Sequence, residues 1–319
     1  MKIFLTGATG AVGPATVSGL VERGEHVRAV ARSDEKAATL RALGAEPVAV
    51  DLFDPDDVKR AVDGSDAILH LATNVPPVSR MNRTSAWATH NALRTTASEH
   101  LVDAALATGV STFVKESVSF VYPDGGDRWV DETTPPAEDV PMLLPTLAGE
   151  RVADRFAAGG GRSVVLRFAG FYGPSARYVD EALRLARWRL AMQSGSPHGY
   201  ASAIHTDDVA SAAIAALDVP SGIYNVADDE PLTKREYVDT FGAAFGLKKL
   251  RIPPAWMARL VTGSSSKAVT RSWRISNRKL KAASGWAPKY PNARVGWAAI
   301  AEARGAGARD GDQEGSHGA

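Results

Sequence analysis

The sequence predicts an α/β protein with a doubly wound parallel sheet and a smaller mixed domain toward the C-terminus. Three observations support this fold class. Short apolar runs alternate with amphipathic segments over residues 2–115, three glycines follow the first run, and five of the seven tryptophans lie beyond residue 173. The chain has 319 residues, of which 45% are hydrophobic, which is enough for one large or two modest domains.

Composition excludes several classes of function. Lys plus Arg is 37 and Asp plus Glu is 36, so no global field attracts nucleic acid or an anionic membrane. The absence of cysteine excludes disulfides, thiolate catalysis and zinc–cysteine sites. No apolar run approaches the roughly 18 residues of a membrane span, no signal peptide is recognisable, and no His spacing indicates a metal site. We therefore expect a cytoplasmic protein without nucleic-acid or membrane partners.

The apolar runs predict strands that are buried on both faces, because they lack strict alternation of apolar and polar residues. These runs are residues 3–5, 27–31, 47–50, 67–71 and 112–114. Helix-like segments lie between them at 12–23, 35–43, 56–63 and 84–108. Right-handed crossovers between such units place the strands parallel in one sheet.

The second half of the chain is less regular. A loop rich in Pro, Gly and acidic residues covers 122–145, followed by a predicted helix at 146–158 and a strand at 163–168. Pro145 is tolerated only in a first helical turn, so this helix should start late. A helix at 205–217 should pack back onto the first domain. We expect 1–172 and 200–227 to form the first domain, 173–199 and 228–303 the second, and 304–319 a disordered tail.

Residues 6–13 read T-G-A-T-G-A-V-G between the first strand and the first helix. Glycines at 7, 10 and 13 permit a tight turn, close approach of a pyrophosphate, and close helix–strand packing. The helix N-terminus offers free N–H groups to the anion. The pattern predicts a Rossmann-type dinucleotide site, and its expected contacts are Thr6, Gly7, Thr9, Gly10, Ala11, Val12 and Gly13.

The end of the second strand favours NADP(H) over NAD(H). An acidic residue usually holds the ribose 2′-hydroxyl of NAD there, whereas this chain has Arg32 nineteen residues beyond Gly13. A guanidinium can hold a 2′-phosphate in a bidentate fork, with help from Arg28 and Lys36. The alternative is that Arg32 is only a solvated charge and Asp34 takes the ribose.

With these motifs the chain resembles the extended or atypical short-chain dehydrogenases/reductases, the NAD-dependent epimerase/dehydratase-like proteins. The resemblance covers about residues 1–300 and rests on several further motifs. These are Asp51-Leu52, Leu71-Ala72-Thr73, Asn91, Leu166-Arg167-Phe168, Tyr172-Gly173-Pro174, the run 205–209, the run 222–226 and the run 285–288. It implies that Asp51 and Leu52 frame the adenine, and that Leu71, Ala72, Thr73 and Asn91 also belong to the cofactor site.

Members of this family usually carry a Ser or Thr after the fifth strand and a Tyr-x-x-x-Lys on the next helix. The Tyr hydroxyl exchanges the proton at the reacting oxygen, and the Lys holds the ribose and lowers the Tyr pKa. Aligned on Glu150, the Tyr position falls on Met142 and the Lys position on Thr146. The chain contains no Tyr-x-x-x-Lys anywhere, so the resemblance implies that the dyad is lost.

Replacement groups must then come from elsewhere. The usual serine position falls on Val118, between Ser117 and Ser119. Ser117 is preferred because it directly follows the predicted strand, although either serine can instead cap the backbone. Tyr122 and Tyr172 are the remaining candidate proton donors. Lys115 shares a strand face with Ser117 and is expected to point toward the site.

The function that follows is an NADP(H)-dependent oxidoreductase or epimerase/dehydratase-like enzyme with an atypical proton donor. Its substrate would be a small carbonyl compound, sugar or secondary metabolite. Loss of the dyad keeps a non-catalytic NAD(P)-binding sensor or scaffold open as an alternative, as well as an isomerase or cyclase. The resemblance also implies a homodimer, paired through the helices at 84–108 and 146–158.

Overall fold

A computed structural model describes residues 1–77, 80–174 and 177–314. Its centre is a seven-stranded sheet in the order β11-β7-β5-β4-β1-β2-β3, with every neighbouring pair parallel. The strands are β1 (Lys2–Thr6), β2 (His26–Val30), β3 (Glu46–Val48), β4 (Ala67–His70), β5 (Thr112–Val118), β7 (Arg162–Phe168) and β11 (Gly222–Val226). The predicted fold class is confirmed.

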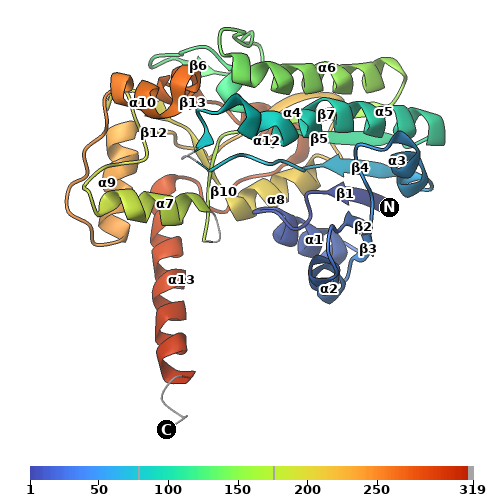
Figure 1. Cartoon of the computed structure of the whole chain (residues 1–319), viewed down its shortest axis with the longest axis horizontal. Helices are drawn as coiled ribbons and strands as arrows, with labels where there is room; N and C mark the ends of the chain where they lie inside the picture. The colour runs from blue at the N-terminus through green and yellow to red at the C-terminus, as the bar shows by residue number, and fades with distance from the viewer. Residues whose placement is uncertain (78–79, 175–176, 315–319) are drawn as a thin grey trace.

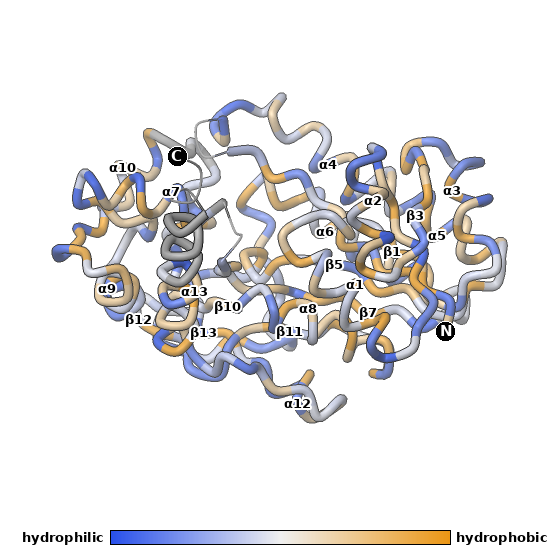
Figure 2. Tube along the Cα trace, turned by 90° about the horizontal axis from the view of Figure 1, so that it is seen from below, coloured by the Kyte–Doolittle hydropathy of each residue, from blue (hydrophilic) through white to orange (hydrophobic). Residues whose placement is uncertain are grey.

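Helices cover both faces of this sheet (Figure 1). The helices are α1 (Gly13–Glu22), α2 (Asp34–Ala42), α3 (Pro55–Val62), α4 (Ala88–Arg94), α5 (Thr96–Thr108), α6 (Leu144–Ala158) and α8 (Thr206–Ala215). Alternate strand residues feed two separate cores. Ile3 and Leu5 of β1 pack with α1 and α8, whereas Phe4 packs with α3, α5 and α6. Hydrophobic segments gather around these central strands (Figure 2).

The remaining elements are three two-stranded sheets and further helices, and an aromatic core around Trp297 holds part of them together. They are β6 (Trp129–Val130), β8 (Gly170–Tyr172), α7 (Arg177–Ala186), β9 (Tyr200–Ala201), β10 (Ala203–His205), β12 (Leu232–Thr233), α9 (Lys234–Ala244), α10 (Ala255–Thr262), α11 (Ser266–Thr270), β13 (Arg274–Ile275), α12 (Arg278–Ser284) and α13 (Ala293–Glu314). Fully buried Trp297 contacts Tyr172, Tyr237 and Phe241 there. No described helix is long and apolar enough to cross a membrane.

Two segments differ from the sequence-based expectation. The helix expected at 84–108 is a 3-10 turn η2 (Thr84–Trp87) followed by α4 and α5, which are separated at Thr95. The expected tail at 304–319 is helical as far as Glu314, and 315–319 lie outside the described residues. This helix begins at Ala293, and within it Arg304 donates to Asp180 Oδ1 and to the Pro174 carbonyl, both at 3.0 Å. The late start of α6 is confirmed, with Pro145 in its first turn.

Candidate functional site

The glycine loop has the geometry that a phosphate site needs. Gly7 has φ +82°, and a Cβ on it would lie 2.6 Å from the Leu71 carbonyl carbon. A Cβ on Gly13 would lie 2.2 Å from the Ala8 carbonyl carbon. Both positions therefore require glycine. Gly10 is exposed, and no side chain caps the first turn of α1. The Gly13 N–H donates to the Gly10 carbonyl at 3.2 Å and Pro14 has no N–H, so an anion would meet the remaining N–H groups and the dipole of this helix end.

The other residues of the predicted phosphate loop surround this turn. Thr6 is buried, and its Oγ1 accepts from the Ala72 N–H at 3.3 Å. Ala11 is exposed, Thr9 is half-buried and Val12 is buried. The strand order of the sheet reverses between the neighbouring strands β1 and β4. The glycine loop after β1 therefore lies at the switch point where open α/β sheets bind ligands.

Two cations follow the end of β2, Arg32 and Lys36, and neither side chain has a partner among the described residues. Arg32 is exposed and has no hydrogen-bond or ion-pair partner among the residues described. Arg28 is not available to assist, because its Nη1 donates to the Ala61 carbonyl at 2.7 Å and its Nε lies 3.6 Å from Glu46. Asp34, the alternative ribose ligand, is exposed in the first turn of α2.

The remaining predicted cofactor residues lie at the ends of β3 and β4 and on α4. Asp51 is exposed and accepts from the Phe53 N–H at 2.9 Å. Leu52 and Leu71 are buried, Ala72 is half-buried and Thr73 is exposed. Asn91 is half-buried, and its Oδ1 is buried without a donor.

The four candidate proton donors predicted from the sequence are all buried, and the contacts of three of them are with other protein groups. Ser117 donates to Glu150 Oε1 at 2.5 Å, and Tyr122 donates to Asn225 Oδ1 at 2.8 Å. Ser119 is 1% exposed. Tyr172 packs against Trp297, with ring centroids 4.9 Å apart, and burial raises its pKa. Ser117 and Tyr122 are linked through Arg167, which donates to Glu150 and lies 4.8 Å from the centroid of the Tyr122 ring, whereas Tyr172 lies in the separate aromatic core around Trp297.

The positions that the resemblance assigns to the Ser and Tyr are apolar. Val118 and Met142 are half-buried and pack against one small cluster. This cluster, here called the apolar wall, consists of Val121, Val140, Leu143, Leu147 and Ala268. Neither Val118 nor Met142 can donate a proton.

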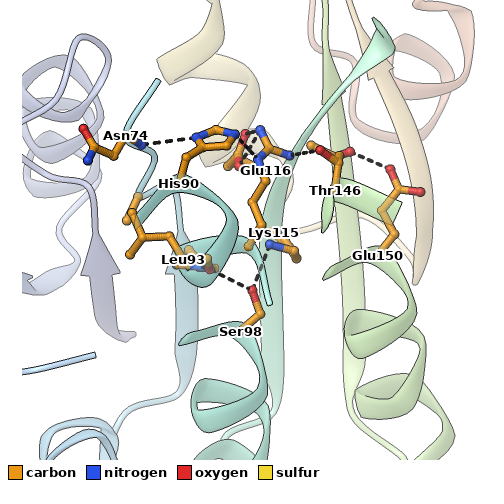
Figure 3. A network of polar contacts seen from close by, with 12 residues as sticks. Asn74, His90, Leu93, Ser98, Lys115, Glu116, Thr146 and Glu150 are labelled. Atoms are coloured by element: carbon orange, nitrogen blue, oxygen red, sulfur yellow. Dashed lines mark hydrogen bonds and ion pairs between the residues drawn. The ribbon is translucent and has the colours of Figure 1, made fainter. Parts of the chain in front are cut away.

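A buried polar network surrounds β5 instead (Figure 3). On one side Arg167 donates to both carboxylate oxygens of Glu150, at 2.9 and 2.6 Å, and Ser117 completes the set. We call this the closed pair. Every carboxylate oxygen in it has a donor.

A second ion pair, the open pair, joins Arg94 of α4 to Glu116 of β5. Nη2 of Arg94 lies 3.0 Å from both carboxylate oxygens of Glu116, but it donates a hydrogen bond only to Oε2. Oε1 is therefore buried with an ion-pair contact and no hydrogen bond. Nη1 donates to Thr146 Oγ1 at 3.0 Å, and Nε donates to His90 Nε2 at 2.8 Å. The guanidinium of Arg94 therefore lies beside Thr146, the position that the resemblance assigns to the Lys.

The sequence predicts that Lys115 points toward the site, whereas the structure places its side chain between α5 and α6. Its Nζ donates to Ser98 Oγ on α5 at 2.9 Å, and a Cβ on Gly149 of α6 would lie 2.6 Å from its Cε. Burial lowers the pKa of Lys115 to about 8. Its amine is enclosed in the helix layer.

Two buried histidines are neutral at physiological pH. Burial lowers the pKa of both His70 and His90 to about 3, and the charges of Lys115 and Arg94 act in the same direction. His70 Nε2 lies 2.9 Å from the Leu93 carbonyl, which can only accept, so its proton is on Nε2. His70 Nδ1 then accepts from Thr6 Oγ1 at 2.7 Å.

Comparison with known proteins settles the family. Residues 3–227 match the model of the NAD dependent epimerase/dehydratase family. The chain belongs to this family. It is an NAD(P)-dependent oxidoreductase/epimerase of the extended short-chain dehydrogenase type.

Two curated relatives of this family member are reductases. A 3-diazoavenalumate denitrifying reductase from a Streptomyces species is 29% identical over 306 residues, covering 93% of this chain and 99% of the relative. A 2-alkyl-3-oxoalkanoate reductase from Stenotrophomonas maltophilia is 28% identical over 273 residues, covering 78% and 77%.

Solved structures share the fold of this epimerase/dehydratase-family chain. The UDP-glucose 4-epimerase of Thermotoga maritima, solved with UDP-glucose, has a TM-score of 0.79 at 22% identity and covers 96% of this chain and 99% of its own. A human epimerase family protein solved with NADPH has a TM-score of 0.75 at 20% identity and covers 95% and 99%.

Sequence reasoning missed the open pair and its partners in this family member. A signal was present, because Lys115 and Glu116 are adjacent charges inside a strand of the central sheet and both need buried partners. His90 and Arg94 lie four residues apart, so they share one face of α4. Together these two features point to a polar network between α4 and β5.

Proposed function

We propose that this chain is an NADP(H)-dependent reductase that delivers hydride to a carbon whose leaving group is dinitrogen. The single observation that carries the proposal is the apolar character of Val118 and Met142 against the apolar wall. A carbonyl reductase must supply a proton to the oxygen that receives the electrons. A reaction that loses dinitrogen has no such requirement.

The atom balance of this reaction fits a site without a proton donor. The hydride of NADPH forms the new C–H bond with its own electron pair, and the C–N bond pair leaves with neutral dinitrogen. An aryl diazonium carbon thereby becomes an aryl C–H, and NADPH becomes NADP⁺. No proton is consumed at the reacting carbon. The name of the Streptomyces relative, with which this chain aligns over nearly its full length, describes a reductive denitrification.

The cofactor supplies the hydride, and the chain supplies its binding. The loop from Thr6 to Gly13 holds the pyrophosphate on the N-terminus of α1. Arg32 binds the 2′-phosphate of NADP(H), because its exposed guanidinium has no protein partner among the described residues. Apolar side chains at 118 and 142 exclude water from the face where hydride leaves.

The cofactor assignment predicts a selective loss. Arg32→Ala should weaken NADPH about 10- to 100-fold and leave NADH nearly unchanged, because only the 2′-phosphate loses a charge-assisted contact. Nucleotide fluorescence titration measures both affinities. Arg41→Ala, at the exposed end of α2, is the matched control and should change neither. An equal loss of both nucleotides in Arg32→Ala would contradict the NADP assignment.

Deuterium transfer tests the reaction itself. The enzyme is mixed with NADPH deuterated at C4 on either face, and with either 3-diazoavenalumate or a 2-alkyl-3-oxoalkanoate. We expect deuterium at the former diazo carbon, one dinitrogen per NADPH oxidised, and little turnover of the ketone. Transfer only to the ketone would replace this proposal with carbonyl reduction, for which the relative from Stenotrophomonas is the precedent. Binding without any transfer would favour a sensor or scaffold.

A further inference from the structure

His90 of α4 lies between two hydrogen-bond donors (Figure 3). The peptide N–H of Asn74 faces Nδ1 at 3.3 Å, and Arg94 Nε faces Nε2 at 2.8 Å. A neutral imidazole has one N–H and one acceptor nitrogen. Only one of the two donors can therefore be satisfied by this ring.

The geometry decides which nitrogen accepts. Arg94 is the shorter contact, it carries a full charge, and it cannot be deprotonated. It is also held in place, because its Nη1 binds Thr146 and its Nη2 binds Glu116. A proton on Nε2 would set an N–H directly against the guanidinium. Nε2 is therefore the acceptor, and the ring proton is on Nδ1.

This tautomer leaves two donors facing each other. His90 Nδ1–H and the Asn74 peptide N–H are 3.3 Å apart, and within 1–77, 80–174 and 177–314 neither has another acceptor. We propose that Arg94 holds His90 in the Nδ1–H tautomer, and that Nδ1–H and the Asn74 N–H together bind an oxygen atom of the bound ligand.

The ligand atom is an oxygen acceptor, since only an acceptor relieves two opposed N–H groups. Asn74 follows β4 on the same segment as Ala72 and Thr73, and His90 lies one residue before Asn91, so the site adjoins the expected cofactor contacts. Two ligand atoms could be this acceptor: the carboxamide oxygen of the nicotinamide, or an oxygen of the substrate. The identity of these ligands rests on the proposed function, whereas the tautomer does not.

The tautomer is measured by ¹⁵N–¹H correlation of the histidine rings in the full chain. His90 should carry its proton on Nδ1, whereas His70, which faces a carbonyl through Nε2, should carry its proton on Nε2. Two buried histidines of one protein thus serve as each other's reference. A His90 proton found on Nε2 would overturn the proposal.

A matched pair of double variants tests the cause. Arg94→Met with Glu116→Met removes both charges of the ion pair together, so neither partner of the pair is left buried alone. His90 should then move its proton to Nε2 and accept from Asn74. Arg167→Met with Glu150→Met removes the closed pair in the same way and should leave His90 unchanged. A tautomer insensitive to Arg94, or equally sensitive to both pairs, would refute the role of Arg94.

Ligand binding is read from the Nδ1 proton of His90 in two arms. A shift with NADPH alone identifies the carboxamide oxygen, and a shift only with NADP⁺ plus 3-diazoavenalumate identifies a substrate oxygen. If NADPH binds and neither arm shifts the proton, the two-donor site is wrong while the proposed function stands. If no nucleotide binds, the proposed function and the ligand assignment both fail, and the tautomer result remains.

Amide substitutions give an independent readout. The amide nitrogen of Asn can replace Nδ1, whereas that of Gln reaches the place of Nε2. The affinity is measured for whichever ligand shifts the Nδ1 proton. His90→Asn should bind this ligand with an affinity within about threefold of the wild type, and the affinity of His90→Gln should be about tenfold lower. Equal affinities in the two variants would count against an Nδ1–H donor.

Discussion

The two ion pairs beside β5 are alike in composition and burial but differ in completeness. Arg167 and Glu150 are 2% and 5% exposed, and Arg94 and Glu116 are 3% and 6% exposed. In the closed pair both carboxylate oxygens have donors, one of them from Ser117 as well. In the open pair Glu116 Oε1 has the ion-pair contact with Arg94 Nη2 but no hydrogen bond, and Arg94 imposes a donor conflict on His90.

This difference separates a structural from a functional role for the same residue types. Buried polar groups in proteins are almost always satisfied, so an incomplete set requires an explanation. Asn91, which shares a face of α4 with Arg94, also has a buried oxygen without a donor. Among the described residues, two of the seven buried side-chain atoms without a hydrogen bond, Asn91 Oδ1 and Glu116 Oε1, lie on the side of β5 where the resemblance places the cofactor, and none belongs to the closed pair.

The largest effect should come from breaking the closed pair. Arg167→Met leaves Glu150 charged and buried, so we expect a loss of about 3–5 kcal/mol in the free energy of unfolding. Urea denaturation followed by tryptophan fluorescence measures this loss. Arg167→Met with Glu150→Met should recover most of the stability. Equal stability of the single and double variants would show that the closed pair is not a structural unit.

The pH dependence of stability should distinguish the open pair from the closed pair. His70 and His90 lie near the charges of Arg94 and Lys115, on the side of the open pair. The folded pKa of His90 is about 3, below its unfolded value near 6.5. The unfolded state therefore binds an extra proton between these values, and stability falls as the pH is lowered from about 6.5 toward 3. His90→Asn should reduce this slope by about 1.4 kcal/mol per pH unit.

The measurement is urea unfolding of wild type and His90→Asn at several pH values between 4 and 6. Exposed His198→Asn is the matched control and should leave the slope unchanged, because His198 has no ion-pair partner among the described residues. Parallel curves for wild type and His90→Asn would mean that His90 is already charged in the folded protein, contrary to the environment described.

The fold could be predicted because its signals are local. The glycines at 7, 10 and 13 and the apolar runs that follow them report directly on a loop and on strands buried on both faces. The break at Thr95 could not be foreseen, since an amphipathic pattern continues through it. The contact of Arg304 in α13 with Asp180 could not be foreseen either, because the two residues are 124 positions apart.

The site was predictable only where backbone geometry forms it. The phosphate loop needs glycine wherever it meets other backbone, and the sequence shows this directly. The network around β5 depends on side chains from β4, α4, α5, β5 and α6, and on rotamers that no local pattern determines. Ser117 was chosen for its place after a strand, yet its partner Glu150 is 33 residues away.

The smallest effects should appear at the hydroxyls that the sequence favoured as catalytic. Ser117→Ala removes one donor of three from Glu150, and Tyr122→Phe removes the donor to Asn225. We expect each to cost about 1 kcal/mol in the free energy of unfolding, because a single hydrogen bond contributes about that much. Turnover in the deuterium assay should stay within about threefold of the wild type, since Glu150 and Asn225 hold these hydroxyls away from any ligand. A 100-fold loss of turnover with unchanged stability would contradict the structural role of the closed pair and place the catalytic groups on its side of β5. Losses of that size are typical when a donor to the transition state is removed.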